Sequence, residues 1–232
     1  MSFTFKKAIW DNDIVTVKKM IDEGFDVNNH GITAINSVMD SYLCDCCETN
    51  RLHKQKDPLA GLEIAKLLLK HGAHPNGRGS SFINTIDTVV SHGFIELFQL
   101  LVQHGIKLSE HPYLLFNAHT IPMAELLIKN GIDINQRWTD GSTVLIRTIV
   151  QTDDLEYITF LLNSSDLYAV NNNNETAFHI ASIWSDLEFV TYLVNNYYDV
   201  HRCNTIKKLV DDDNENQAAD IKAYLKKELS NI

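Results

Sequence analysis

A recurring short pattern constrains the fold of this chain more than its overall composition does. The pattern is an apolar run that is followed, a few residues later, by a glycine. It closes at Gly24, Gly72, Gly105 and Gly131, while Ser164 or Ser165 and Tyr197 hold the same place in two further copies. Three intervals are 33 residues long: 72 to 105, 131 to 164, and 164 to 197. A fixed period of this length indicates repeated supersecondary units stacked in a row.

Two intervals deviate from the period in opposite directions. The interval from Gly24 to Gly72 spans 48 residues, fifteen too many, and the interval from Gly105 to Gly131 spans 26, seven too few. The surplus lies in residues 41–60, inside the second repeat. The deficit follows Gly105, so we expect the fourth repeat to lack a projecting hairpin and to have Pro112 in the first turn of the next helix.

Each copy also has the residue chemistry of a helix pair. Apolar residues recur at the spacing of one helix face, as in Ile64, Leu67 and Leu68 and, in the last copy, Phe189, Tyr192 and Leu193. The closing glycine suits a left-handed residue at a helix end. Four polar residues stand where first helices would begin and be capped: Thr33, Asn84, Thr143 and Thr176. Such pairs bury their apolar faces only by stacking on neighbours.

The clearest copy resembles the ankyrin repeat family. TAFHIASIWSDLEFVTYLVNNYYDVH, residues 176–201, follows the family pattern T-P-L-H-x-A-A-x-x-G-H-x-E-I-V-x-x-L-L-x-x-G-A-D-V-N. The resemblance covers residues 3–201 and departs from the pattern where Ala34, Val144 and Ala177 replace the proline. Only His179 keeps the histidine, which in the family serves the fold by hydrogen bonding. No nucleophile or metal ligand is spaced for a catalytic role beside it.

The resemblance implies an all-α fold, an ankyrin-repeat solenoid of stacked helix-turn-helix units with short β-hairpin fingers. We expect about six repeats and a helical C-terminal cap in a single domain over residues 1–232. The expected parts are an N-terminal capping repeat 1–30, repeat 2 at 31–76 with the insertion 41–60, repeat 3 at 77–109, a shortened repeat 4 at 110–135, repeat 5 at 136–170, repeat 6 at 171–201, and the cap 202–232. In the cap, Ile221, Tyr224, Leu225 and Leu229 share one helix face.

Composition and charge narrow the function classes. With 44% hydrophobic and 22% charged residues among 232, the chain has the composition of a globular protein. Its net charge of -10 argues against nucleic acid and favours a protein partner with a basic surface. The chain has no run of eighteen apolar residues, no export-type N-terminus and only four cysteines. We therefore expect a cytoplasmic location, in its own or a host cell, with no membrane, cofactor or small-molecule substrate.

The insertion contains the cysteine cluster. Cys44, Cys46, Cys47 and His53 could supply three thiolates and an imidazole to Zn²⁺. Adjacent cysteines chelate one ion poorly, however, and the spacing C-x-C-C-x5-H matches no known zinc motif. We therefore favour ordinary thiols under a recognition loop over a metal site.

The resemblance also implies where a partner would bind, because ankyrin arrays use their hairpin tips and the first helices of the concave face. Carrying over the family's variable positions gives these candidate partner-binding residues: Trp10, Asp11, Asp40, His92, Asn117, Arg137, Trp138, Asp140, Gln151, Asn173 and Trp184. All three tryptophans are in this set, as expected of binding hot spots, although each could instead cover a neighbouring repeat. Further acidic residues near this surface would suit a basic partner: Asp13, Asp153, Asp154 and Asp186.

Three functional hypotheses remain open at this stage. The first is a non-catalytic module that binds and inhibits or sequesters a partner, for example an immunity protein neutralising a toxin. The second is a pathogen or viral effector or adaptor that docks a host protein. The third is an enzyme or metal sensor built on the cysteine insertion, but the chain has no nucleophile elbow, zinc-protease, P-loop or dinucleotide motif. We predict a binding module and no enzyme.

Overall fold

The computed structural model of the chain describes residues 3–28, 34, 35, 37, 38, 58–75, 85–197 and 217–230, and leaves the side chains of Pro58 and Leu229 undescribed. The described part is helical and contains no β-strand. Within it, the β pairing is limited to an isolated antiparallel bridge between Arg137 and Thr143. The predicted all-α fold is therefore confirmed. No helix in this part combines the length and apolarity needed to cross a bilayer.

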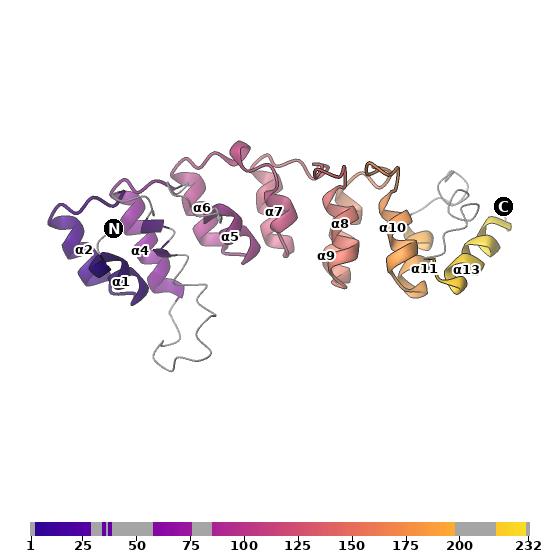
Figure 1. Cartoon of the computed structure of the whole chain (residues 1–232), viewed down its shortest axis with the longest axis horizontal. Helices are drawn as coiled ribbons and strands as arrows, with labels where there is room; N and C mark the ends of the chain where they lie inside the picture. The colour runs from indigo at the N-terminus through magenta and orange to yellow at the C-terminus, as the bar shows by residue number, and fades with distance from the viewer. Residues whose placement is uncertain are drawn as a thin grey trace. The chain divides into compact units, whose positions relative to one another are not determined.

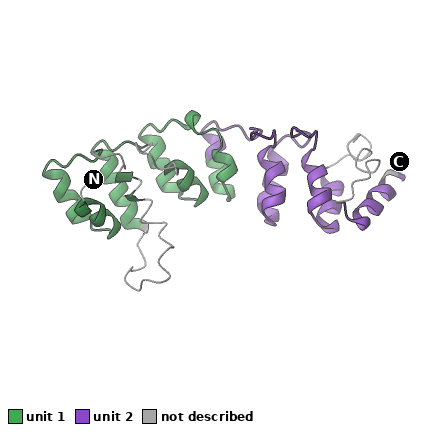
Figure 2. Ribbon diagram, viewed as in Figure 1, with its two compact units in different colours: residues 1–126 green, residues 127–232 purple. Residues whose placement is uncertain are grey.

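The chain divides into two compact units, residues 1–126 and 127–232 (Figure 2). The first contains α1 (Phe3–Trp10), α2 (Ile14–Asp22), α4 (Pro58–Lys70), α5 (Thr85–Ser91), α6 (Ile95–Gln103) and the 3-10 helices η2 (Leu108–Glu110) and η3 (Leu114–Asn117). In this unit α1 packs on α2 and α5 on α6, while α2, α4 and α6 follow one another as a row of second helices. Helix α7 (Ile121–Lys129) carries the chain into the second unit (Figure 1).

The second unit repeats the same arrangement. It contains α8 (Val144–Gln151), α9 (Leu155–Ser164), α10 (Ala177–Trp184), α11 (Leu187–Asn196) and α13 (Ala219–Ser230). Helix α8 pairs with α9 and α10 with α11, and α8 packs along α10 (Figure 1). The terminal helix α13 packs on α11 through a face that includes the buried Ile221 and Leu225, as expected of a cap.

One leucine position shows why the repeats stack. Leu68, Leu101 and Leu193 lie at equivalent places in their repeats, and each is 0% exposed. In the first unit the helix ends as the glycines predict: Gly72 and Gly105 both have φ +83°, and the amide of the next residue donates to Leu68 O at 3.0 Å or Leu101 O at 3.2 Å. The periodic pattern therefore correctly predicts both which leucines are buried between repeats and where these helices end.

The predicted caps of the first helices are confirmed where they are described. Thr143 accepts a hydrogen bond from the Ile146 amide at 3.4 Å and caps α8. At α10 the amide of Thr176 donates to His179 Nδ1 at 3.1 Å, while the His179 amide donates to Thr176 Oγ1 at 3.4 Å. This reciprocal capping box gives His179 the structural role expected of it. The proposed caps Thr33 and Asn84 lie outside the described residues.

The shortened fourth repeat differs from its prediction in one respect. Residues 106–113 form η2 and no β bridge, in the place where no hairpin was expected. However, Pro112 does not begin an α-helix, because the segment before α7 is too short and forms the 3-10 helix η3. In α7 the first turn contains Pro122 instead, where a missing N–H costs no hydrogen bond.

Successive inter-repeat loops are joined by asparagine side chains. Asn28 donates through Nδ2 to Gly72 O at 2.7 Å and accepts through Oδ1 from the His74 amide at 2.9 Å. In the second unit Asn135 Oδ1 accepts from the Asp166 amide at 2.7 Å. Each of these asparagines ends one repeat and fixes the backbone of the next.

Candidate functional site

The hairpin tips of repeats 5 and 6 touch each other through the backbone. The first tip closes with a hydrogen bond from the Trp138 amide to Ser142 O at 2.8 Å. The amide of Asn172, in the next tip, donates to Asp140 O at 2.9 Å. Gly141 lies between them with φ +78°, and a Cβ there would stand 2.5 Å from Asn172 Oδ1. Only glycine fits, because both the backbone conformation and the neighbouring tip exclude a side chain.

Arg137, a predicted partner-binding residue, strengthens this junction. Its guanidinium donates from Nη1 to Gly141 O at 3.0 Å and also to Val170 O. The side chain therefore holds the two tips together, although the residue as a whole is exposed. Asn173 is exposed at the tip of repeat 6, and its amide donates to Asn171 Oδ1 at 3.0 Å.

Trp138, Asp140 and Arg147 form a cluster at the base of the first tip. The Arg147 guanidinium carbon lies 4.8 Å from the centre of the Trp138 ring, and its Nη1 lies 3.4 Å from Asp140 Oδ2. The Ser142 amide, which donates to Asp140 Oδ1 at 2.9 Å, lowers the pKa of the Asp140 carboxyl, and the Arg147 charge adds to this effect. Asp140 is therefore held as a carboxylate.

A shallow hollow of about 260 Å³ extends from Asp140 and Arg147 of this cluster along α8. The exposed Gln151 and the 53% exposed Val150 line it. We call this region the hairpin-side surface, and it consists of Arg137, Trp138, Asp140, Arg147, Val150, Gln151 and Asn173. Of the residues predicted to bind a partner, five fall within it.

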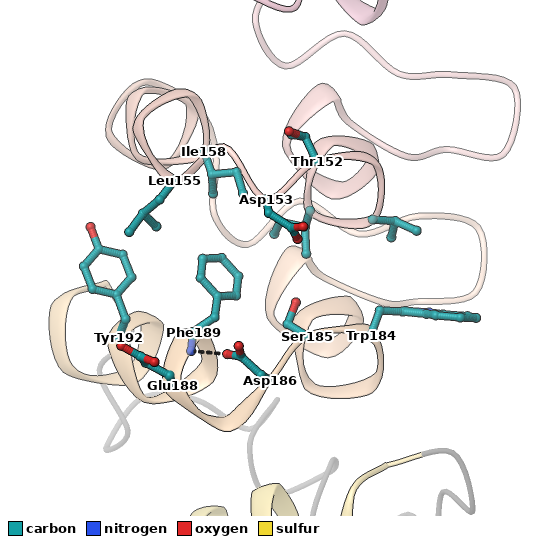
Figure 3. Close-up of a pocket in the computed structure, with 12 residues that line it drawn as sticks. Thr152, Asp153, Leu155, Ile158, Trp184, Ser185, Asp186, Glu188, Phe189 and Tyr192 are labelled. Carbon is teal, nitrogen blue, oxygen red and sulfur yellow. Dashed lines mark hydrogen bonds between the residues drawn. The ribbon is translucent and has the colours of Figure 1, made fainter.

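A second, larger hollow lies between the two helix pairs at their inter-helix turns. It measures about 420 Å³, and we call it the inter-repeat hollow. Its lining residues are Ile149, Val150, Thr152, Asp153, Leu155, Ile158, Trp184, Ser185, Asp186, Glu188, Phe189 and Tyr192. In Figure 3, Leu155 and Phe189 point into the space between the pairs, with Tyr192 at one end and Trp184 at the other.

Trp184 is the last residue of α10, and 68% of it is exposed. The sequence analysis grouped it with Trp138 as a partner-binding residue, and in the structure it lies at the rim of the inter-repeat hollow (Figure 3). The apolar stripe predicted for α11 also needs correction, because Val190, Leu193 and Val194 are its buried residues. Phe189 and Tyr192 are only half-buried and line the hollow, together with residues of α8 and α9.

Four of the predicted partner-binding residues that the structure describes belong to the first unit. Trp10 is half-buried with Lys6 Nζ 4.4 Å from its ring centre, and Asp11 beside it is exposed. His92 is exposed with its ring 5.8 Å from that of Phe94. The remaining member, Asn117, is half-buried, and its Nδ2 lies 3.5 Å from Asp87 Oδ1.

Two predictions concern residues outside the described part of the chain. Asp40 is one, and the zinc hypothesis for Cys44, Cys46, Cys47 and His53 is the other. Within the described residues, no group of three or more histidine, cysteine, aspartate or glutamate residues is placed to hold a metal ion.

Three of the aspartates expected near a partner also cap second helices. Asp13 accepts from the Thr16 amide at 3.0 Å, Asp154 from the Tyr157 amide at 3.1 Å, and Asp186 from the Phe189 amide at 2.8 Å. Each carboxylate satisfies a free amide of the first helical turn. All three aspartates are also exposed, so they contribute negative charge to the surface besides capping their helices.

Arg147, Phe189 and Tyr192 were absent from the predicted site. A signal for Arg147 was present, because it precedes Gln151 by four residues and so shares a helix face with it. No comparable signal marks Phe189 and Tyr192, since an aromatic residue at helical spacing reads as core. Their exposure depends on how two neighbouring repeats meet.

The fold and part of the sequence match known proteins. Residues 113–204 match the family model for ankyrin repeats in three copies, whereas no curated protein matches the sequence. The human ASB11 ankyrin repeat domain is similar in structure, with 18% identity, 96% of each chain covered and a TM-score of 0.62. The ankyrin repeat domain of Bcl-3, a member of the IkappaB protein family, has 16% identity, 82% of each chain covered and a TM-score of 0.59.

A third similar chain comes from a complex. It belongs to the structure of the Bd0816 predatory endopeptidase from Bdellovibrio bacteriovorus with the immunity protein Bd3460. It has 20% identity and a TM-score of 0.58, with 83% of this chain and 94% of that chain covered. Identities of this size establish a shared fold. The chain therefore carries ankyrin repeats, recognised by sequence in residues 113–204, and has the ankyrin-repeat fold.

Proposed function

We propose that the chain is a non-catalytic protein-binding module whose second unit binds a partner through the hairpin-side surface. Ankyrin repeats are protein-interaction modules, which sets the class of function. The observation that carries the proposal is the cluster of Trp138, Arg147 and Asp140 beside the exposed Val150 and Gln151. Aromatic and arginine side chains on a rigid surface are the usual anchors of a protein interface.

The rigidity of this surface supports the proposal. The two tips are joined by backbone hydrogen bonds and by Arg137, so little conformational entropy would be lost when a partner binds. Arg147, Val150 and Gln151 of this surface lie on α8, which packs directly on α10. A preorganised surface of this kind is suited to specific recognition.

Charge supports a partner with a basic surface. Between residues 127 and 197 the chain has nine acidic residues and three basic ones: Asp133, Asp140, Asp153, Asp154, Glu156, Asp166, Glu175, Asp186 and Glu188 against Lys129, Arg137 and Arg147. Both arginines contact neighbouring groups of the same hairpin region. The excess of carboxylates would speed association with a basic protein and would make it sensitive to salt.

The test is the double variant Arg147→Ala/Gln151→Ala, compared with the wild type and with Lys19→Ala/Gln103→Ala. The control pair removes similar exposed side chains from α2 and α6 of the first unit. Partners that co-purify with the tagged wild-type chain are identified by mass spectrometry, and their affinities are then measured by calorimetry. We expect the first variant to weaken binding about tenfold or more, corresponding to about 1.4 kcal/mol, and the control to leave it unchanged. Equal affinity for all three proteins would refute the proposal.

The finer hypothesis is that binding inhibits or sequesters the partner, as an immunity protein does to a toxin. The chain of similar fold in the endopeptidase–immunity protein complex favours this hypothesis by analogy. The alternative is an effector or adaptor that docks a host protein and leaves it active. Titration of the purified partner separates them, because an inhibitor abolishes its activity at a one-to-one ratio and an adaptor does not. A toxin reading frame beside the gene would favour the first.

A further inference from the structure

The inter-repeat hollow opens at the turn ends of the second unit and adjoins the hairpin-side surface at Val150, which lines both hollows. Part of its lining is apolar, with Ile149, Leu155, Ile158 and Phe189 contributed by three helices. At about 420 Å³ it lies within the range of about 300–1,000 Å³ typical of binding pockets. The hollow is therefore large enough to take side chains from another molecule.

The charges around the hollow are all of one sign. Asp153, Asp186 and Glu188 line it, and none of its lining residues is a lysine or arginine. The ion pairs recorded among the described residues involve none of these three carboxylates. One oxygen of Asp186 accepts the Phe189 amide at 2.8 Å, which leaves its second oxygen on the side of the hollow (Figure 3). An unneutralised acidic rim over an apolar floor favours a cationic occupant.

Trp184 adds a second feature that suits a cation. Its ring stands at the end of the hollow opposite Tyr192 and is 68% exposed (Figure 3). The face of an indole ring attracts a guanidinium or ammonium group, and a guanidinium also stacks on it. Trp184 and Asp186 are two residues apart at the end of α10 and its turn, so a single side chain could contact both.

We infer that the inter-repeat hollow binds a basic segment of a partner protein, in which an arginine or lysine is followed by an apolar residue. The cationic group lies against Trp184 and pairs with Asp186 and Asp153, while the apolar neighbour occupies the floor between Leu155 and Phe189. This inference rests on the proposed function only in assuming a protein partner. It adds a second contact surface, on the turn side rather than the hairpin side of the second unit.

The direct test uses short labelled peptides with the purified full-length chain. The probe is a fluorescein-labelled Ala-Leu-Arg-Leu-Arg-Ala peptide, and the matched probes replace both arginines with glutamine or with glutamate. Binding is followed by fluorescence anisotropy at two salt concentrations. We expect the arginine peptide to bind at least about tenfold more tightly than either matched peptide, and to weaken as salt rises. Equal binding of the three peptides would overturn the inference.

Variants of the chain locate the binding. Asp186→Asn keeps the cap of α11, because asparagine caps a helix as well as aspartate does, and removes only the charge. We expect Asp186→Asn and Trp184→Ala each to weaken the arginine peptide about five- to tenfold. The matched control is Asp166→Asn, which removes one charge from a loop outside the hollow, where Asp166 Oδ1 accepts the Tyr168 amide at 2.9 Å. Thermal denaturation verifies that all variants are folded.

The outcomes separate this inference from the proposed function. The inter-repeat hollow is supported as the site if peptide binding is lost in Asp186→Asn and Trp184→Ala. Arg147→Ala/Gln151→Ala should then bind the peptide as the wild type does. The reverse pattern places the peptide on the hairpin-side surface and overturns the inference without touching the proposed function. Analytical ultracentrifugation tests whether a second copy of the chain occupies the hollow instead. Self-association of the wild type that is abolished by Trp184→Ala would show this and would also overturn the inference.

Discussion

The inter-helix turns of the two units are built differently. In the first unit Asn12 and Gly93 occupy the α1–α2 and α5–α6 turns with φ +56° and +68°, and the next amide donates five residues back, from Asp13 to Ala8 O and from Phe94 to Val89 O. In the second unit Thr152 and Ser185 are extended, with φ -149° and -107°, and their amides donate only four residues back. The left-handed turns are closed by a hydrogen bond to the end of the preceding helix, whereas the backbone of the extended turns leads away from that helix.

This difference changes how neighbouring repeats meet. A Cβ built on Gly93 would lie 3.7 Å from Thr120 Oγ1, so that left-handed turn is in contact with the turn of the following repeat. In the second unit the corresponding place, between the turns at Thr152 and Ser185, is the inter-repeat hollow. In these two pairs of repeats, a left-handed turn accompanies a filled turn side and two extended turns accompany an open one.

The largest expected effect tests whether the two units, despite their different turns, share one kind of core. Leu101→Ala and Leu193→Ala truncate equivalent residues that are both 0% exposed. Each should lower the free energy of unfolding by about 2–5 kcal/mol, because the neighbouring repeats cannot close the cavity. Denaturant titration measures this, with fluorescence from variants that keep only Trp10 or only Trp138 reporting on each unit. A loss below about 1 kcal/mol at either position would contradict a shared core.

Alkaline pH should affect the second unit through Tyr157. Burial in α9 raises the pKa of this phenol from 10.0 to about 12. Its contribution to stability is complete below pH 10 and is lost between pH 10 and about 12, where the unfolded chain ionises and the folded chain does not. A shift of this size corresponds to about 2–3 kcal/mol. Tyr157→Phe should therefore lose less stability than the wild type between pH 9 and pH 11.5 in parallel denaturant titrations.

The turn comparison itself is tested by two alanine substitutions. Gly93→Ala places a Cβ on a left-handed residue and should cost about 1–2 kcal/mol, whereas Ser185→Ala, on extended backbone, should change stability by less than about 0.5 kcal/mol. Asn12→Gly should be neutral or stabilising for the same reason. Urea midpoints of the three variants measure these differences. A Gly93→Ala protein as stable as the wild type would break the distinction between the units.

A smaller effect is expected where the second unit's turns cap its helices. Asp154→Ala removes the side chain that accepts the Tyr157 amide and should cost about 1 kcal/mol. Asp154→Asn should recover most of this loss, because the cap needs an acceptor oxygen rather than a charge. Thermal denaturation of the two variants at pH 7 separates the contributions. Equal losses in both would show that the charge matters more than the hydrogen bond.

The smallest effect is a shared response of the two units to acid. Hydrogen bonds from Thr16 lower the pKa of Asp13, and the Ser142 amide lowers the pKa of Asp140. The contribution of each carboxylate is complete above the unfolded pKa of 3.8 and is lost as pH falls through the lower folded value. Unfolding midpoints from pH 5 to pH 2 should therefore fall less steeply in Asp140→Asn than in the wild type. Parallel curves would contradict the lowered pKa.

Sequence reasoning reached the features that each repeat determines by itself. The period located the buried leucines such as Leu101, and the glycines and threonines marked helix ends that the structure describes, as at Gly105 and Thr176. These features are local, so their residue chemistry is visible within one copy. The role of His179 followed in the same way.

Features that arise between repeats escaped prediction. Arg137 reads as a free surface cation, yet it bonds the carbonyl of Val170, 33 residues away. Phe189 reads as core, yet it lines a hollow, because the space it faces depends on two extended turns. A helix was expected after Pro112, but the 3-10 form of η3 was not, because so short a segment leaves no periodic signal. On the turn side, Trp184, Asp153 and Asp186 were predicted to face a partner, but the hollow that they line was not, because it depends on how two neighbouring repeats meet.

The asparagine links at Asn28 and Asn135 have an evolutionary consequence. Each link uses a side chain from one loop and main-chain groups from the following loop, so it demands a compatible backbone rather than a particular neighbouring residue. A repeat that ends in such an asparagine can therefore form the same hydrogen bonds to whichever repeat follows it. Duplication or loss of whole blocks would thus preserve the junctions while the exposed tips diverge freely.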